Sequence, residues 1–162
     1  AGIETLPLFD DEFLFVTADA KLGSAQSPLP IEKIDPDQLL LLEDGHCLRD
    51  HAIAACSMQS LQTNRTLSAT SLITLTHMVA SGLGHTLLPE LAIAGGVLSG
   101  SSLYARRFTP RGPSRTIALA FRKTSARRDE IAELGKIFAQ SKGFTGTARA
   151  KTVRNARIAK RA

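Results

Sequence analysis

The segment ATSLITLTHMVASGLGHTLLPE, residues 69–90, carries the most regular pattern in this chain of 162 residues. Four apolar side chains fall on one face at helical spacing: Leu72, Leu75, Met78 and Val79. Thr70 or Ser71 stands before them, where a hydroxyl can cap a helix N-terminus. Gly82 and Gly84 then end the helix, and HTLLP has the composition of a short strand. The segment therefore predicts a helix, a glycine turn and a strand in succession.

The same alternation extends in both directions along the chain. Strand character is found in LPLFDDEFLFVTA, LLLLED, RTLSA, LYARRF and RTIALAF, and helical spacing in CLRDHAIAACSMQSL and RRDEIAELGKIFAQS. Residues 20–38 are rich in Pro, Gly and Ser, which predicts a surface loop with a short helix near Pro36. Strands that alternate with helices predict an α/β sandwich with a largely parallel sheet. The first strand and RTIALAF are candidates for crossing between two lobes.

Charge and hydropathy exclude some classes of protein. The net charge of +5 arises in residues 145–162, which contain six of the 20 basic residues and no acidic residue, so the remainder has a net charge of −1. We expect residues 145–162 to be a solvated, disordered basic tail and not a nucleic-acid surface. No apolar run approaches the ~20 residues of a membrane span, and no secretory signal is visible. A start at Ala1 that runs directly into a strand favours a fragment of a longer protein.

The two cysteines of the chain lie in LEDGHCLRDHAIAACSMQ, residues 42–59. If Cys47 and Cys56 share one helix, their Cα atoms are ~13 Å apart on opposite faces. A disulfide requires Cα atoms within about 7 Å, so the pair can bridge only if the helix unwinds. Cys47 follows Gly45 near the expected helix start, where free N–H groups favour a thiolate. Cys56, in the apolar AIAAC stretch, suits the resolving thiol that condenses with a sulfenic acid.

Composition alone leaves other interpretations of the cysteines open. Two unremarkable buried thiols are the commonest outcome in a chain of this kind. A zinc site is a second alternative, because Cys47 and His51 are four residues apart and His46 is adjacent. Cys56 would point away from such a site and the chain has no CxxC pair, so we predict no metal.

The segment EDGHCLRDHAIAAC, residues 43–56, closely resembles the redox segment of the peroxide-sensing OxyR branch of the LysR-type bacterial transcription regulators. ATSLITLTHMVASGLGHTLLPE resembles the effector-domain pattern of the wider family, and PSRTIALAFR continues the match. The resemblance covers about residues 4–144 and implies a periplasmic-binding-protein-like α/β fold of two lobes joined by two crossing strands. It implies that residues 10–115 form the second lobe and that residues 1–9 and 116–144 belong to the first. We expect the N-terminal winged helix-turn-helix of the family to be absent from this chain.

The resemblance also implies a function and a set of site residues. Cys47 corresponds to the peroxide-reactive cysteine and Cys56 to its disulfide partner, and the supporting residues are His46, Arg49, Asp50 and Arg115. The expected function is redox sensing by a hydrogen-peroxide-responsive regulator that is no enzyme and needs no cofactor. The expected partners are hydrogen peroxide, further copies in a homodimer or tetramer, promoter DNA and RNA polymerase through the full-length protein, and a thiol reductant, in the bacterial cytoplasm.

Two other functions remain as alternatives. In a metabolite-binding LysR-type effector domain, the hydroxyls of Thr70 and Ser71 would hold a small carboxylate at a helix N-terminus. A thiol peroxidase would use the same cysteines but consume peroxide continuously. We expect His51 to lie on a helix surface and His77 and His85 to pack or form hydrogen bonds. We expect Arg106 and Arg107 to be solvated.

Overall fold

The structure is a computed structural model, and it describes residues 2–25, 29–55, 67–110 and 112–140. The chain divides into two compact units: unit 1 comprises Ala1–Phe9 and Ile117–Ala162, and unit 2 comprises Asp10–Thr116. The expected assignment of residues 10–115 to one lobe and of residues 1–9 and 116–144 to the other stays a prediction. Within the described residues, no helix is long and apolar enough to cross a membrane.

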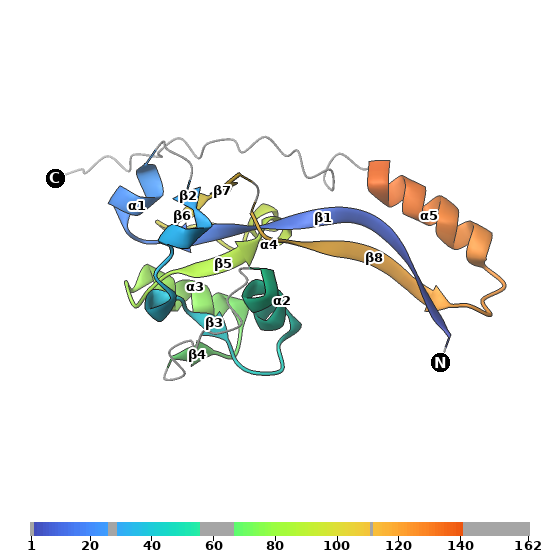
Figure 1. The fold of residues 1–162 in the computed structure, drawn as a ribbon, viewed down its shortest axis with the longest axis horizontal. Coiled ribbons are helices and arrows are strands. Elements are labelled where there is room, and N and C mark those ends of the chain that lie inside the picture. The colour runs from blue at the N-terminus through green and yellow to red at the C-terminus, as the bar shows by residue number, and fades with distance from the viewer. Residues whose placement is uncertain (1, 26–28, 56–66, 111, 141–162) are drawn as a thin grey trace. The chain divides into compact units, whose positions relative to one another are not determined.

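Strands and helices alternate along most of the described chain, but the three strands β6, β7 and β8 follow one another without a helix between them (Figure 1). In chain order they are β1 (Ile3–Thr17), α1 (Ala20–Ser24), β2 (Leu29–Pro30), η1 (Ile31–Lys33), η2 (Pro36–Gln38), β3 (Leu41–Leu42), α2 (Cys47–Ala55), β4 (Ser68–Ala69), α3 (Leu72–Ala80), β5 (Thr86–Pro89), α4 (Glu90–Ala94), β6 (Tyr104–Arg106), β7 (Phe108–Thr109), β8 (Ser114–Arg122) and α5 (Arg128–Gln140). The predicted loop over residues 20–38 therefore also contains α1, β2 and a second short helix. These elements were missed because each is only two to five residues long.

The strand β1 organises the sheet of unit 2. It pairs antiparallel with β5, Phe13 lying opposite Pro89, and antiparallel with β6, and it also pairs with β8. Parallel pairing joins β2 with β7 and β3 with β4, and an isolated parallel bridge joins Leu39 and His85. The prediction of a largely parallel sheet is therefore wrong, and the pairing is mixed. Strand direction depends on how distant connections return, which local periodicity does not encode.

The helix α3 forms where the sequence predicts it and packs against β3, β4 and β5 (Figure 1). Leu75 and Val79 are buried in one apolar cluster with Val16, Leu40, Leu42, Ala69 and Leu88, and partly buried Leu72 and Met78 pack against it. Gly82 has a φ of +77°, a conformation that L side chains rarely adopt. At Gly84 a Cβ would lie 2.4 Å from the carbonyl oxygen of Gln38, so only glycine allows this close approach.

Unit 1 contains the first part of β1, most of β8 and the helix α5. Exposure alternates along β8, as expected for a strand with one covered face. Gly135 of α5 is buried, and a Cβ there would lie 2.7 Å from the side chain of Leu6. Glycine at this position therefore lets α5 approach β1 closely, and an ion pair between Arg128 and Glu4 at 2.7 Å adds a polar contact.

Candidate functional site

The helix α2 begins at Cys47, so the predicted position of this cysteine at a helix start is confirmed. A turn at Asp44 and Gly45 precedes it, and Gly45 has a φ of +91°. The N–H of Arg49 donates to the carbonyl of His46 at 2.9 Å, which closes the first turn. The side chain of Cys47 is a free thiol and is exposed. The first turn of a helix therefore presents an accessible sulfur.

Three apolar residues fix α2 against the rest of unit 2. Ala52 is buried in a second apolar cluster that contains Phe13, Phe15, Leu41 and Leu87, and Ile53 packs against the same cluster. Leu48 packs against both clusters. The helix thus presents one face to the core while Cys47, at its first position, remains accessible to solvent.

The arginine in the first turn of α2 joins the helix to the preceding strand. The Arg49 Nη1 donates to the carbonyl oxygen of Leu42 at 2.9 Å, and its Nε pairs with Asp44 Oδ1 at the same distance. The Arg49 side chain is only 14% exposed, whereas that of Asp44 is 91% exposed. Two further supporting residues, His46 and Asp50, are exposed, as is His51 on α2.

Cys56 lies outside the described residues, so the predicted separation of the two sulfurs is not tested. Ala55, which precedes Cys56 in the chain, is the last residue of α2. Within the described ranges, no group of three or more His, Cys, Asp or Glu side chains could hold a metal ion.

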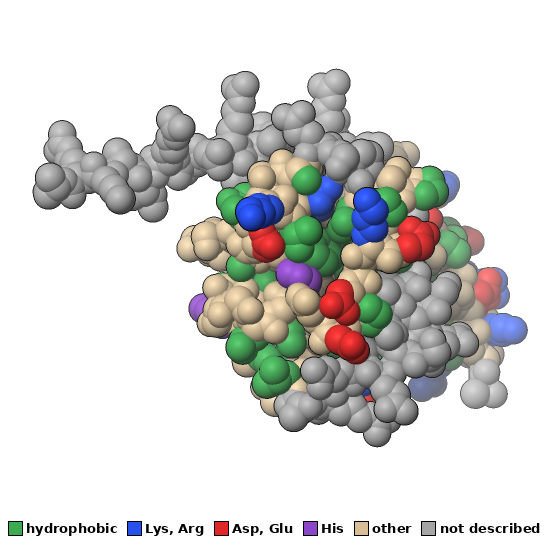
Figure 2. All heavy atoms as spheres, turned by 60° about the vertical axis from the view of Figure 1, so that its left-hand side comes forward, with side chains coloured by type: hydrophobic (Ala, Val, Ile, Leu, Met, Phe, Trp, Pro, Cys, Tyr) green, Lys and Arg blue, Asp and Glu red, His purple; other side chains and the backbone are tan. Residues whose placement is uncertain are grey.

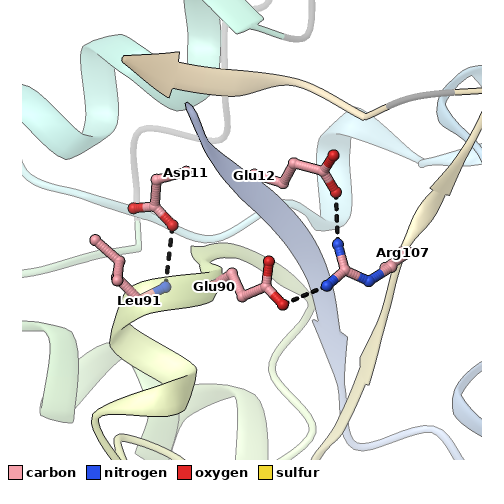
Figure 3. Close-up of polar contacts among 5 residues, drawn as sticks. All are labelled: Asp11, Glu12, Glu90, Leu91 and Arg107. Atoms are coloured by element: carbon pink, nitrogen blue, oxygen red, sulfur yellow. Dashed lines mark hydrogen bonds and ion pairs between the residues drawn. The ribbon is translucent and has the colours of Figure 1, made fainter. Parts of the chain in front are cut away.

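Arg115 forms an ion pair with a buried carboxylate that the sequence reasoning did not single out. Its Nε donates to Asp11 Oδ2 at 3.0 Å, and its Nη2 lies 3.0 Å from the same oxygen. The side chain of Asp11 is 1% exposed. Its other oxygen accepts from the N–H of Leu91 in the first turn of α4 at 3.0 Å (Figure 3). Asp11 therefore holds both Arg115 and the start of α4. The only signal in the sequence was an acid inside an apolar strand.

Arg107 bridges two glutamates, so the expectation that it is solvated is wrong. Its Nη1 lies 2.5 Å from Glu12 Oε2 on β1, and its Nη2 binds Glu90 at the start of α4 (Figure 3). Arg106 is also bound, because its Nη1 donates to the carbonyl oxygen of Leu22 at 2.5 Å. The partners of these arginines are distant in sequence, and side-chain type alone could not identify them.

Ser71 is the N-cap of α3. Its Oγ accepts from the N–H of Thr74 at 3.1 Å and lies 2.9 Å from the Thr74 hydroxyl. The capping role predicted for this serine is confirmed, and exposed Thr70 precedes it.

His85 packs in unit 2, as predicted, with its ring 5.0 Å from that of Phe15. Among the described residues, no hydrogen-bond partner reaches its buried Nδ1. Burial lowers the pKa of His85 below its usual 6.5, while the charges of Asp19 and Asp35 act in the opposite direction. His77 on α3 is exposed.

Charges of both signs are dispersed over one face of the described residues. On the face drawn in Figure 2, Lys and Arg side chains lie among acidic, hydrophobic and other polar ones and form no patch of one sign. This agrees with the near-neutral charge calculated for residues 1–144.

The sequence and the fold of the chain can be compared with those of known proteins. The family model for the LysR substrate binding domain matches residues 1–141. The chain belongs to the LysR substrate-binding domain family. Its fold is the mixed helix-and-strand, periplasmic-binding-protein-like fold of that family, as the sequence predicted.

The similar proteins include curated transcription regulators and solved OxyR structures. A probable hydrogen peroxide-inducible genes activator of Streptomyces viridosporus is 41% identical over 135 residues, covering 82% of this chain and 43% of the relative. The HTH-type transcriptional regulator EstR of Acinetobacter baylyi is 43% identical over 101 residues, covering 62% of this chain and 34% of the relative. A solved structure, the hydrogen-peroxide-bound C206S mutant of OxyR from Corynebacterium glutamicum, is 30% identical with a TM-score of 0.73, covering 85% of this chain and 44% of that one. This LysR substrate-binding domain spans less than half the length of the curated relatives.

Proposed function

We propose that this chain is the redox-sensing regulatory domain of a hydrogen-peroxide-responsive LysR-type transcription regulator, and that it switches through a reversible Cys47–Cys56 disulfide. The observation that carries the proposal is the accessible thiol of Cys47 at the first residue of α2. The similarity to a peroxide-inducible activator and to a peroxide-bound OxyR structure supports the same assignment. Unit 2 then corresponds to the second lobe of the regulatory domain, and unit 1 to part of the first.

The first chemical step is attack by the Cys47 thiolate on one oxygen of hydrogen peroxide. A sulfur–oxygen bond forms and the oxygen–oxygen bond breaks, and the leaving hydroxide takes a proton to become water. The product is a sulfenic acid at Cys47.

The second step is condensation with Cys56, which forms the disulfide and releases a second water. The helix α2 places the Cα atoms of Cys47 and Ala55 ~12 Å apart, and one further residue adds or removes at most ~3.8 Å. A residue that follows Ala55 therefore cannot approach Cys47 to within ~7 Å while α2 is intact. The bond requires α2 to open, so oxidation is coupled to a change of backbone structure.

The rest of the proposed mechanism depends on the full-length protein. A rearranged α2 alters the packing between copies in a homodimer or tetramer, and this repositions the DNA-binding domains on promoter DNA and changes contacts with RNA polymerase. A dithiol reductant in the bacterial cytoplasm then restores both thiols by exchange. The domain is a switch that reacts once per signal and is not an enzyme.

The proposal is tested by mapping the thiols after oxidation. The protein is treated with one equivalent of hydrogen peroxide, the remaining thiols are alkylated, and the peptides with Cys47 and Cys56 are identified by mass spectrometry. We expect a peptide pair joined by a disulfide. In Cys56→Ser, a sulfenic acid at Cys47 should be trapped by a dimedone-type reagent, whereas in Cys47→Ser the thiol of Cys56 should stay fully alkylatable.

The outcomes separate the three candidate functions. Complete alkylation of both cysteines after peroxide treatment would contradict a redox switch. Sustained consumption of peroxide at catalytic protein concentrations with a dithiol would instead identify a thiol peroxidase.

A metabolite-binding effector domain is the second candidate, and the observation that favours it is the N-terminus of α3, capped by Ser71. In that case the first turn of α3, capped by Ser71, would bind a small carboxylate. Thermal shifts with a panel of small carboxylates distinguish the two functions, because stabilisation by such a ligand should survive Cys47→Ser but not Ser71→Ala.

A further inference from the structure

We infer that Arg49 is a positioning residue that latches α2 in the reduced state and thereby sets the redox potential of the Cys47–Cys56 pair. This inference rests on the proposed disulfide switch. It assigns to Arg49 a thermodynamic role that is separate from any contact with peroxide.

The latch connects α2, which must open during oxidation, with β3, which stays in place. Arg49 lies two residues after Cys47 in the first turns of α2. Its acceptor, the carbonyl of Leu42, belongs to β3, and Leu42 is 5% exposed. Register with Ala69 of β4 and a hydrogen bond from Glu43 N to the Ala69 carbonyl at 3.1 Å fix this end of β3.

The bonds of Arg49 to Leu42 and to Asp44 differ in strength. The bond to the Leu42 carbonyl is a charge-assisted hydrogen bond from a side chain that is 14% exposed, so water competes weakly for it. The ion pair with Asp44 reaches a carboxylate that is 91% exposed, and pairs of that kind contribute little. Of these two bonds, the carbonyl bond therefore contributes more to the latch.

Opening of α2 separates the latch from its acceptor. The residues between the two cysteines must leave their helical positions before the sulfurs can join, and Arg49 lies among them. The apolar contacts of Leu48, Ala52 and Ile53 oppose the same change, but Arg49 is the charged group that holds the first turn to β3. The latch thus stabilises the dithiol form and not the disulfide form.

Removal of the latch should make the disulfide easier to form. In the exchange with glutathione disulfide, the protein dithiol is oxidised to the disulfide and two molecules of glutathione are released, so two electrons pass to glutathione. Loss of one charge-assisted hydrogen bond from the reduced protein alone shifts this equilibrium about tenfold toward the protein disulfide. That shift lowers the reduction potential of the pair by about 30 mV.

The experiment measures the potential of the 162-residue chain in glutathione redox buffers, with the disulfide fraction read by alkylation and mass spectrometry. Arg49→Met keeps an unbranched side chain but removes every donor. The matched control is Arg127→Met, which removes an arginine that is 76% exposed on unit 1. Arg127→Met should leave the potential unchanged, and Asp44→Asn should move it by less than about twofold in the equilibrium constant.

The outcomes distinguish the latch from the switch itself. If the disulfide forms in both the parent chain and Arg49→Met, and the two reduction potentials are equal, the latch is overturned. Failure of the parent chain to form the disulfide at any glutathione ratio overturns the proposed function instead. If Arg49→Met does not fold, Arg49→Lys retains one charged donor and should lower the potential by a smaller amount. A change in thermal stability without a change in potential would show a merely structural role and would also overturn the latch.

Discussion

Replacement of the buried carboxylate of Asp11 should destabilise unit 2 strongly, whereas replacement of its neighbour should not. Asp11 is 1% exposed and binds both Arg115 and the N–H of Leu91. Asp10 is exposed, and the interaction that the structure shows for its side chain is one hydrogen bond from the Thr116 hydroxyl at 2.9 Å. Asp11→Ala and Asp10→Ala are thus matched changes at adjacent positions of β1.

The expected loss in the free energy of unfolding follows from the groups that lose their hydrogen-bond or ion-pair partner. Loss of the bond to the Leu91 N–H removes a cap from α4 and costs about 1 kcal/mol. Breaking a fully buried ion pair costs about 3–5 kcal/mol, but the Arg115 side chain is 23% exposed, so water can hydrate part of it. We assign about 2 kcal/mol to this part, which gives about 3 kcal/mol for Asp11→Ala. Asp10→Ala should cost less than about 0.5 kcal/mol.

The assay uses the intrinsic fluorescence of the chain. The protein has no tryptophan and a single tyrosine, Tyr104, which lies on β6 in unit 2. Its emission in a urea titration therefore reports on the unfolding of unit 2. With a urea dependence of about 2 kcal/mol per molar, 3 kcal/mol lowers the midpoint by about 1.5 M.

Equal midpoint shifts for the two variants would refute this reasoning, because burial and pairing could then not be the cause of the difference. Asp11→Asn provides a second check. The amide can still accept from the Leu91 N–H but has no charge for Arg115, so its midpoint should lie between those of Asp11→Ala and the parent chain.

Three further changes test other contacts. Arg107→Met leaves two partly buried carboxylates without their shared cation, so the urea midpoint should fall by the equivalent of about 1–2 kcal/mol. A midpoint of Arg107→Lys equal to that of the parent chain would contradict the need for the fork-shaped guanidinium. The pKa of His85 is lowered in the folded state, so the unfolded chain binds a proton at this histidine before the folded chain does as the pH falls. The free energy of unfolding should therefore decrease from about pH 7.5 to about pH 5.5. His85→Phe should weaken that decrease in parallel urea titrations at each pH. Gly84→Ala places a Cβ 2.4 Å from the Gln38 carbonyl and should cost about 1–3 kcal/mol in thermal unfolding, whereas an unchanged melting temperature would mean that the backbone yields easily.

Much of the fold could be predicted because its signals are local. The spacing of Leu72, Leu75 and Val79 determines which face of α3 is buried, and the positive φ of Gly82 ends that helix. The start of α2 at Cys47 could likewise be predicted from the preceding turn. Short elements such as α1 and β2 could not, because two to five residues span too little of a period to leave a pattern.

The polar contacts of the site were less predictable than its position. The sequence identified Arg49 and Arg115 as members of the site but not their partners. Leu42 is seven residues from Arg49, and Asp11 is 104 residues from Arg115. Partners at such separations are determined by which strands become neighbours, and single-residue chemistry contains no information on that choice.

The sequence by itself determined the family pattern, the local helices and strands, and a cysteine at the first position of a helix, because these follow from spacing along a short stretch of chain. Only the tertiary structure decided that the strand pairing is mixed, that Asp11 is buried between Arg115 and α4, and that Arg49 reaches back to β3. Each of these depends on contacts between segments that are distant along the chain or on backbone groups that all residues share. They become defined only when the whole core packs and the competing water is removed.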